Sequence, residues 1–256
     1  MRLSAILITR NEAANIGDCL DALAFCDERI VVDCGSSDDT VAIARGKGAR
    51  VETHEFRGFG PQKNFALSLA TGDWVLSIDA DERVTPELAQ AIKAAIVEGQ
   101  ADGQADAYEL PRISSFCGRP MGHSGWFPDY VLRLFRRGQG RFDDALVHER
   151  VICDGTVKRL GKPLIHHPVL ELEDALSRMD RYSTAGAATL IASGRRVSFF
   201  TGIAHGCFAF FKTYVLRLGF LDGAEGFLLA VANAEGSYYR YMKAWLAQRA
   251  AQRRAK

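Results

Sequence analysis

Short apolar runs alternate with helix-like stretches over the first hundred residues, and this alternation restricts the fold more than any other feature. Leu3–Ile8 is a continuous apolar run, as a buried parallel strand should be. Further strands are expected at Arg29–Asp33, Ala49–Thr53 and Asp73–Asp79, and helices near residues 16–23, 40–47, 61–69 and 85–97. Such an alternation predicts right-handed crossovers and an α/β fold, with a mainly parallel sheet flanked by helices.

Polar residues stand where three of these strands end. Thr9, Asp33 and Asp79 fall at carboxyl ends, which is where parallel sheets bind ligands. Asp81 follows Asp79 at a spacing of two, which at a strand end puts both carboxylates on one side. Two such carboxylates can grip one divalent cation and the phosphates bound to it. An isolated Asp-x-Asp is more often an acidic surface turn, so other motifs must decide between the two interpretations.

The pattern changes after residue 106. From Ala107 to Pro168 the expected strands are short and interrupted by glycines, which favours a mixed extension with an acceptor-binding surface. After Leu170 the pattern is helical. We therefore predict a catalytic domain over residues 1–170, with a nucleotide-binding half at 1–100 and an acceptor half at 101–170. A helical appendage is predicted over residues 171–256.

Charge is divided unevenly along the chain. Residues 1–175 contain 20 Lys and Arg against 27 Asp and Glu, whereas residues 176–256 contain 12 against 4. A basic tail on an acidic body favours an anionic partner, either a membrane or a nucleic acid. Nucleic acid is disfavoured because no recognised binding motif accompanies the charge. A merely solvated helical face is the alternative.

The basic tail also carries an apolar stripe at helical spacing between Phe199 and Leu221, and an aromatic-rich segment at Gly226–Trp245. No uninterrupted run of about 20 apolar residues, the length that spans a bilayer, occurs there. Aromatic residues with neighbouring cations favour a helix that lies among the headgroups of an anionic leaflet. Packing on the catalytic domain and contact between copies of the chain are the alternatives.

The six cysteines show no Cys-x-x-Cys pair, and four of them stand in apolar or strand-like contexts where thiols pack as small hydrophobic groups. The apolar part of the N-terminus, Leu3–Ile8, is too short for a secretory signal. We expect a reduced, cytoplasmic protein that is peripheral on the inner face of the cytoplasmic membrane.

Four motifs follow one another in the first hundred residues: Thr9-Arg10-Asn11-Glu12, Asp33-Cys34-Gly35-Ser36-Ser37-Asp38, Gly58-Phe59-Gly60-Pro61-Gln62-Lys63-Asn64 and the Asp79/Asp81 pair. In order and spacing they resemble the nucleotide half of family 2 glycosyltransferases, which have the GT-A fold. Four later motifs resemble the lipopolysaccharide inner-core β-1,4-glucosyltransferase subgroup: Gly125–Asp129, Arg133–Arg137, Val147–Glu149 and Gly219–Gly223. The resemblance implies an inverting, metal-dependent transfer of glucose from UDP-glucose to a glycolipid acceptor of the lipopolysaccharide-core type.

The same resemblance implies roles for residues near the donor nucleotide. Asp33 is expected to accept a hydrogen bond from the uracil imide N–H, and Thr9 to contact the base through its backbone. Asn11 and Glu12 are expected to shape that pocket. Lys63 is expected near the base or the diphosphate, with a solvated lysine at a helix start as the alternative.

The resemblance also implies a divalent cation, Mn²⁺ or Mg²⁺. Asp81 is expected to ligate it directly, and Asp79 to face the ribose or share the ion. His166, after the expected strand Pro163–Ile165, is a candidate third ligand. An imidazole ligand suits Mn²⁺ better than Mg²⁺. A hydrogen-bonded histidine at a strand end is an equally good interpretation.

An inverting transfer needs a base that takes the proton of the acceptor hydroxyl. Glu149 is the predicted base, because it ends the Val-His-Glu pattern of the subgroup. Asp129, Asp143 and Asp144 are its rivals, and a surface salt bridge with Arg150 is the alternative role for Glu149.

Trp126, Asp129 and Arg133 are the predicted acceptor contacts. An aromatic face suits a sugar ring, and a guanidinium suits an acceptor phosphate. Core packing is the alternative for Trp126.

Two other functions stay open. A sugar nucleotidyltransferase shares the α/β architecture, but it favours a glycine-rich loop after the first strand, and here no glycine occurs between Thr9 and Gly17. A catalytically silent UDP-binding or membrane-scaffold protein is the second alternative. The sequence leaves the donor sugar, the acceptor, the preferred ion and the oligomeric state undecided.

Overall fold

The computed structural model describes residues 1–98, 105–143, 150–169 and 171–254, and it divides into two compact units. The first unit contains residues 1–112 and 129–166, and the second contains residues 113–128 and 167–256. Residues 113–128 thus group with the C-terminal helices. The predicted division into a catalytic domain over residues 1–170 and a helical appendage over residues 171–256 stays a prediction.

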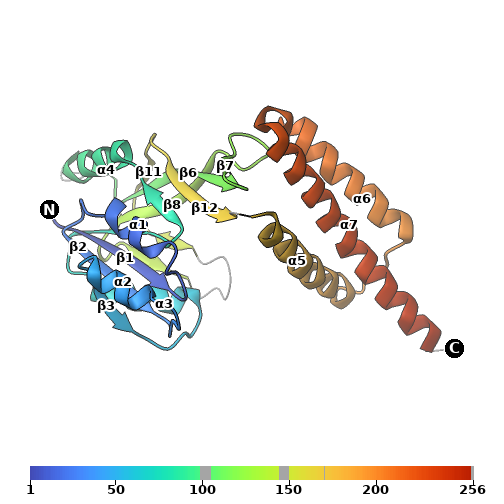
Figure 1. Cartoon of the computed structure of the whole chain (residues 1–256), viewed down its shortest axis with the longest axis horizontal. Coiled ribbons are helices and arrows are strands. Elements are labelled where there is room, and N and C mark those ends of the chain that lie inside the picture. The colour runs from blue at the N-terminus through green and yellow to red at the C-terminus, as the bar shows by residue number, and fades with distance from the viewer. Residues whose placement is uncertain (99–104, 144–149, 170, 255–256) are drawn as a thin grey trace. The chain divides into compact units, whose positions relative to one another are not determined.

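The nucleotide half of the first unit is a parallel sheet in the order β3-β2-β1-β4. Helices connect these strands and lie beside them (Figure 1). The strands are β1 (Leu3–Thr9), β2 (Glu28–Asp33), β3 (Arg50–Thr53) and β4 (Trp74–Ser77), and the helices are α1 (Ile16–Ala22), α2 (Thr40–Gly46) and α3 (Phe59–Leu69). The expected α/β fold, with a mainly parallel sheet flanked by helices, is confirmed.

The sheet continues as a mixed extension beyond β4, in the order β8-β6-β12-β5. The elements are β5 (Glu82–Val84), α4 (Pro86–Glu98), β6 (Ala107–Phe116), β7 (Arg119–Pro120), β8 (Asp129–Arg136), β9 (Gly140–Phe142), β10 (Val151–Cys153), β11 (Val157–Arg159) and β12 (Leu164–Val169). Strands β9 and β10 form a separate hairpin, and β12 pairs antiparallel with β5, placing His166 opposite Glu82. His166 thus lies within a strand rather than after its end, which corrects the sequence-based expectation.

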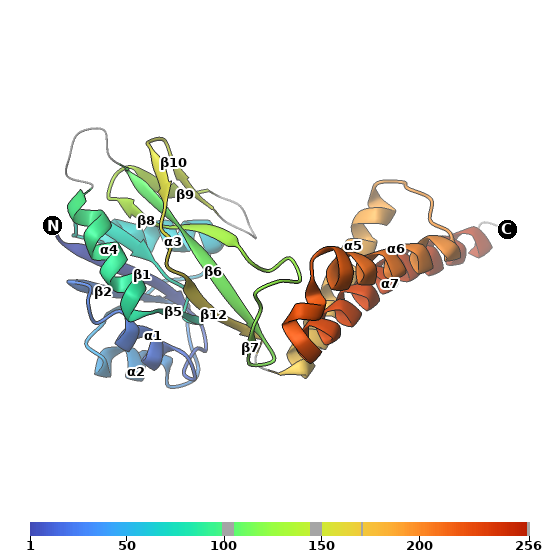
Figure 2. The same cartoon turned by 90° about the horizontal axis from the view of Figure 1, so that it is seen from above.

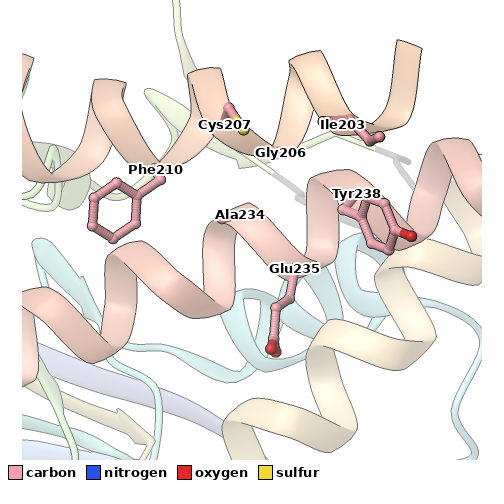
Figure 3. Close-up of a pocket in the computed structure, with 7 residues that line it drawn as sticks. All are labelled: Ile203, Gly206, Cys207, Phe210, Ala234, Glu235 and Tyr238. Atoms are coloured by element: carbon pink, nitrogen blue, oxygen red, sulfur yellow. The ribbon is translucent and has the colours of Figure 1, made fainter. Parts of the chain in front are cut away.

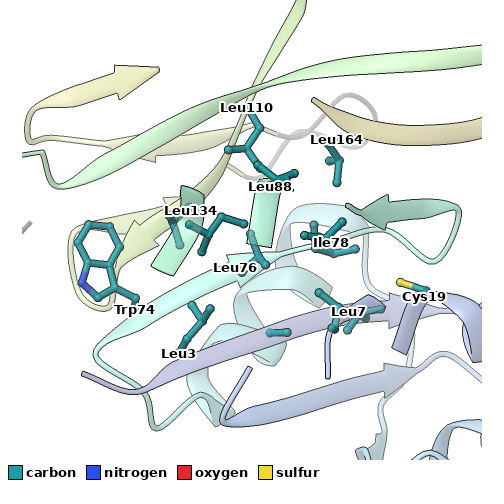
Figure 4. Packing of buried hydrophobic residues seen from close by; sticks show 14 of the residues in the cluster. Leu3, Leu7, Cys19, Trp74, Leu76, Ile78, Leu88, Leu110, Leu134 and Leu164 are labelled. Atoms are coloured by element: carbon teal, nitrogen blue, oxygen red, sulfur yellow. The ribbon is translucent and has the colours of Figure 1, made fainter. Parts of the chain in front are cut away.

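The core of the first unit covers both faces of the parallel strands. Along β1, Leu3 and Leu7 belong to one apolar cluster, whereas Ile6 belongs to another. This alternation follows from the two-residue period of a strand, and burial of both faces explains its uninterrupted apolar sequence. Figure 4 shows Leu7 of the larger cluster with Cys19 of α1 beside it, and Leu76 on the neighbouring strand.

All six cysteines are free. Burial raises the pKa of the Cys19 and Cys26 thiols to about 12, so both remain protonated near neutral pH. The expectation that such thiols pack as small hydrophobic groups therefore holds for these two.

The second unit is mostly helical, and α5 and α6 both pack against the long helix α7 (Figure 2). Its elements are α5 (Leu172–Ala192), α6 (Phe199–Phe211), the π-helical turn η1 (Lys212–Leu216), the 3-10 turn η2 (Gly219–Asp222) and α7 (Gly223–Arg254). Ser198 begins α6 with a capping box, in which its side chain accepts from the Thr201 N–H.

One helical stretch of the described residues is long and apolar enough to cross a membrane by length and composition. It covers Phe199–Leu216, with a mean hydropathy of 1.2 and 17% of the stretch buried. The stretch still contains no uninterrupted run of about 20 apolar residues, and the expected peripheral association with a membrane stays a prediction.

Candidate active site at the strand ends

The loops that follow β1 and β2 are tied together by polar contacts. Asn11 adopts a left-handed conformation with φ of 57°, which asparagine tolerates better than most residues. Its N–H donates to Ser36 Oγ at 2.8 Å, and its Oδ1 accepts from the Ser37 N–H at 2.8 Å. The Glu12 N–H donates to Thr40 Oγ1 at 2.7 Å. The predicted nucleotide pocket is therefore held by contacts between two loops.

Asp33 is the buried centre of the second loop, with 2% of its surface exposed. Its carboxylate accepts from the Gly35 N–H at 2.9 Å, the Ser36 N–H at 2.8 Å and the Ser36 hydroxyl. Thr9 Oγ1 is a weaker donor at 3.4 Å. Asp33 therefore shapes its own loop, and the expected contact with uracil stays a prediction.

Glu12 is half-buried, and its Oε2 accepts from Asn15 Nδ2 at 2.9 Å. Burial raises the pKa of its carboxyl group, and the negative charges of Asp81 and Asp79 act in the same direction. The hydrogen bond from Asn15 opposes the rise. The three carboxylates therefore share one electrostatic environment.

Asp79 follows the end of β4, and two cations pair with it. Lys63 Nζ donates to its Oδ1 at 2.9 Å, and Arg133 Nη2 donates to its Oδ2. Burial alone would raise the pKa of Asp79, but the charges of Arg133 and Lys63 hold it far below its usual range. Asp79 thus stays ionised, and both of its oxygens already face cations. Lys63 is 4% exposed, so it is not the solvated lysine of the alternative interpretation.

The ion pairs continue away from Asp79 through a buried glutamate. Glu82 has no exposed surface, and it accepts from Arg133 Nη2 at 2.7 Å and Arg112 Nη1 at 3.4 Å. Its Oε2 also accepts the Asp79 N–H at 3.0 Å. Arg112 in turn donates from Nε and Nη2 to Asp129 Oδ2, at 2.9 and 2.6 Å. Together with Lys63 these residues form a charge network of three cations and three carboxylates.

Two predicted acceptor contacts belong to this network. Arg133 is only 7% exposed and pairs with Asp79 and Glu82, so it does not present a free guanidinium to an acceptor phosphate. Asp129 is paired with Arg112, although 43% of its side chain is exposed. Sequence reasoning missed Glu82 and Arg112. The one available signal for Glu82 was its position directly after Asp81, and no signal indicated Arg112.

Trp126, the third predicted acceptor contact, lies in the second unit. Its ring meets Phe116 edge-on, with ring centroids 5.9 Å apart, and it packs on a cluster that includes Met121 and Leu229. Trp126 therefore packs against apolar residues, as the alternative interpretation expected. A contact between Trp126 and the acceptor stays a prediction.

Asp81 lies apart from the charge network and pairs with His166. The distance from Asp81 Oδ2 to His166 Nε2 is 3.3 Å, and the side chains are 29% and 15% exposed. Burial would raise the pKa of Asp81, yet the hydrogen bond from His166 and the charge that His166 carries when protonated lower it.

This pair fits a divalent cation. Two ligands bound at about 2.1 Å to one octahedral ion lie about 3 Å apart, close to the observed separation. A carboxylate and an imidazole together suit Mn²⁺. Within the described ranges, no group of three or more His, Cys, Asp or Glu side chains is placed to hold a metal. An ion bound here therefore needs further oxygens, such as those of a diphosphate.

Glu149 and Asp144 lie outside the described residues. The described residues on either side of them are Asp143, which follows β9, and Arg150, which precedes β10. The Asp143 N–H donates to the Arg150 carbonyl at 3.0 Å. Asp143 Oδ1 accepts the Arg150 N–H at 3.1 Å, so this rival base holds the hairpin. Asn64 of α3 clamps Phe142 through two hydrogen bonds of 2.9 Å. The hairpin base is thus fixed to the predicted nucleotide half.

Replacing Glu82 by glutamine should destabilise the protein strongly. The variant keeps the shape of the side chain but leaves Arg133 and Arg112 with one carboxylate fewer in a buried setting. Removing one partner of a buried ion pair costs about 3–5 kcal/mol. Urea unfolding of Glu82→Gln measures this loss, and Asp129→Asn, at the exposed end of the same network, should lose at most about 1 kcal/mol. Equal losses in the two variants would contradict the assigned burial.

The chain matches the model of glycosyl transferase family 2 over residues 4–152. A lipopolysaccharide core biosynthesis glycosyltransferase, LpsC of Rhizobium meliloti, is 31% identical over 91% of this chain and 87% of the relative. An uncharacterized glycosyltransferase of Rickettsia felis is 30% identical over 94% and 89%.

Among solved structures, S. aureus TarS 1–349 in complex with UDP matches 98% of this chain and 92% of that chain, at 17% identity and a TM-score of 0.49. Glucosyl-3-phosphoglycerate synthase of Mycobacterium tuberculosis, in complex with Mn²⁺, UDP and glucosyl-3-phosphoglycerate, covers 44% of both chains at 27% identity and a TM-score of 0.36. The family model and the curated relatives are the stronger similarities.

Proposed function

Since the chain belongs to glycosyltransferase family 2, we propose that it is an inverting, metal-dependent hexosyltransferase that moves glucose from UDP-glucose to a glycolipid of the lipopolysaccharide-core type. The observation that carries the proposal is the placement of Asp81 and His166, 3.3 Å apart, beside the carboxyl ends of parallel strands. The similarity to a lipopolysaccharide core glycosyltransferase over 91% of the chain supports the acceptor class.

The two joined loops after β1 and β2 provide the uridine site in this proposal. Thr9 would contact the base through its backbone, Asn11 and the half-buried Glu12 would shape the pocket, and Asp33 would accept a hydrogen bond from the uracil imide N–H. Asp33 organises its loop through hydrogen bonds from Gly35 and Ser36, which supports a pocket that is largely formed before the nucleotide binds.

In this proposal, the carboxylates at the strand ends help UDP to leave. Asp81 and His166 would hold the divalent cation, and Asp79 would face the ribose while Lys63 and Arg133 keep it ionised and in place. When bound, such an ion neutralises charge that develops on the departing diphosphate. Mn²⁺ or Mg²⁺ would serve, with Mn²⁺ better matched to the imidazole.

Glu149 is proposed as the base. It removes the proton from the acceptor hydroxyl as that oxygen bonds to the anomeric carbon. The bond from this carbon to the UDP oxygen breaks, and UDP leaves with the electron pair. Attack from the face opposite UDP inverts the anomeric configuration.

The acceptor is proposed to reach the site from the cytoplasmic membrane, where the enzyme is peripheral. A glycolipid acceptor is anchored in a bilayer, and the C-terminal residues 176–256 carry the excess of Lys and Arg that anionic lipids attract. Trp126 and Asp129 remain the proposed contacts to acceptor sugars.

Ligand-induced stabilisation tests the donor. With Mn²⁺ present, UDP-glucose at about 100 times its dissociation constant should stabilise the folded protein by about 2.7 kcal/mol, because it binds only the folded state. GDP- and dTDP-sugars at the same concentration should give much smaller thermal shifts. Transfer of labelled glucose to a core-type acceptor then tests the reaction. Stabilisation by UDP-glucose without transfer to any acceptor would instead favour the silent UDP-binding protein.

A further inference from the structure

The helices of the second unit expose many large apolar side chains along one continuous stretch of chain. Phe200 is 76% exposed, Leu216 60% and Phe208 57%. We define the apolar surface as six such residues of α6, η1 and η2: Phe200, Phe208, Phe211, Leu216, Phe220 and Leu221. Soluble monomers rarely expose contiguous apolar patches of this kind unless the patch binds something.

Exposed cations flank this surface along the chain. Arg195 and Arg196 precede α6, and Lys212 and Arg217 lie within and just after η1. All four are exposed. An apolar surface with cations at its margins matches a bilayer whose lipids carry negative headgroups.

We propose that the apolar surface inserts in the plane of an anionic bilayer, with α6 lying along the headgroup region instead of crossing the membrane. The proposal rests on the proposed function, because a glycolipid acceptor places the reaction at such a surface. Beyond the proposed function, it specifies which segment contacts the membrane and how α6 is oriented there.

The packing of α6 on α7 argues against a crossing. A Cβ atom added to Gly206 would lie 3.2 Å from Tyr238 Cβ, and His205 stacks on Tyr241 at 4.1 Å between ring centroids. An open, shallow apolar groove of about 310 Å³ lies between the two helices, and its lining includes Glu235 (Figure 3). If α6 spanned a bilayer, α7 would carry Glu235 toward the hydrocarbon core, where each charge costs about 2.5–3.5 kcal/mol or more.

The same surface is joined to the loop that contains Trp126. Asp222, at the end of η2, is 3% exposed and accepts the Gly122 N–H at 3.1 Å and the Ser124 hydroxyl at 2.7 Å. The ring of His123 meets the same carboxylate at 3.1 Å. The Ser124 N–H donates to the Arg217 carbonyl at 2.8 Å. Membrane insertion of η1 and η2 would therefore hold this loop at the lipid surface.

Vesicle flotation tests the contact. The full chain should float with vesicles that contain phosphatidylglycerol and should not float with pure phosphatidylcholine. The double variant Leu216→Asp/Phe220→Asp should bind at least about 30-fold more weakly, because two apolar side chains leave the lipid and two negative charges face it. Val97→Asp, a 65% exposed position on α4, is the matched control and should bind as the wild type. Unchanged binding of the double variant would overturn the proposal.

The orientation has its own test. Phe208 lies near the middle of the apolar stretch Phe199–Leu216 and is 57% exposed, so Phe208→Trp places a fluorophore there. Brominated lipids should quench the added fluorescence most strongly when bromine is near the headgroup. Strongest quenching by bromine near the chain ends would overturn the in-plane orientation and favour a spanning helix.

Two further measurements separate this inference from its alternatives. A wild-type dimer in vesicle-free solution that Leu216→Asp/Phe220→Asp converts to a monomer would assign the surface to self-association and overturn the proposal. Glucose transfer to a water-soluble, delipidated acceptor does not need a membrane. Transfer without vesicle binding would therefore refute this inference alone, and vesicle binding without transfer would refute the proposed function alone.

Discussion

The variant Asp81→Asn is expected to lower the turnover number for glucosyl transfer by about 10²–10³-fold, the loss typical when charge stabilisation of a leaving group is removed. Asp81 shares its environment with His166 at 3.3 Å and is 29% exposed, so it is open to an incoming ion. An amide is a weaker ligand for a hard cation than a carboxylate. Initial rates measured over a series of Mn²⁺ concentrations should therefore reach half of their maximum at a higher Mn²⁺ concentration, and the maximum itself should be lower.

Asp21→Asn is the matched control for this variant, because Asp21 has a 57% exposed side chain that pairs with Lys47 on the surface. Its transfer rate and its Mn²⁺ dependence should equal those of the wild type. Should Asp81→Asn retain a rate within a few-fold of the wild type at low Mn²⁺, the ion must be held by other groups.

Local sequence signals were sufficient to predict the nucleotide half. Leu3–Ile8 was expected as a strand and β1 covers Leu3–Thr9, since a buried parallel strand is apolar on both faces. The helix expected near residues 85–97 is observed as α4, and the Leu88 N–H in its first turn donates to Thr85 Oγ1 at 3.2 Å. These features depend on neighbours a few residues away, and one sequence contains that information.

The charge network could not be predicted in the same way. Glu82 meets Arg133 across 51 positions and Arg112 across 30, because β5, β6 and β8 belong to one mixed sheet. The order of strands in a mixed extension is not fixed by periodicity or by turn signals. Arg133 was consequently assigned to acceptor phosphates, whereas its position in the sheet makes it a partner of Asp79.

The grouping of residues 113–128 with the C-terminal helices has a similar cause. Asp222 holds the backbone of Gly122 and His123 through contacts that span about a hundred positions. The sequence shows only a glycine-rich stretch near Gly122 and an isolated acidic residue at Asp222. Neither pattern indicates its partner, so this grouping could not be predicted from one sequence.

Replacing Glu149 by glutamine is expected to reduce the turnover number by about 10²–10⁴-fold, the usual loss when a positioned general base is removed. Glutamine keeps the size of the side chain but accepts no proton at neutral pH. The Michaelis constant for UDP-glucose should change little, because the base acts on the acceptor hydroxyl and not on the nucleotide. Steady-state kinetics with both substrates varied separates these two constants.

Asp143→Asn and Asp144→Asn provide the comparison, since both residues were rivals for the same role. Asp143 holds the hairpin through the Arg150 N–H at 3.1 Å, and an asparagine oxygen can still accept that hydrogen bond. Its variant should therefore keep both its stability and most of its turnover. If Asp143→Asn or Asp144→Asn loses the larger factor and Glu149→Gln loses only a few-fold, the base is the aspartate whose variant is inactive, and the Val-His-Glu motif serves another purpose.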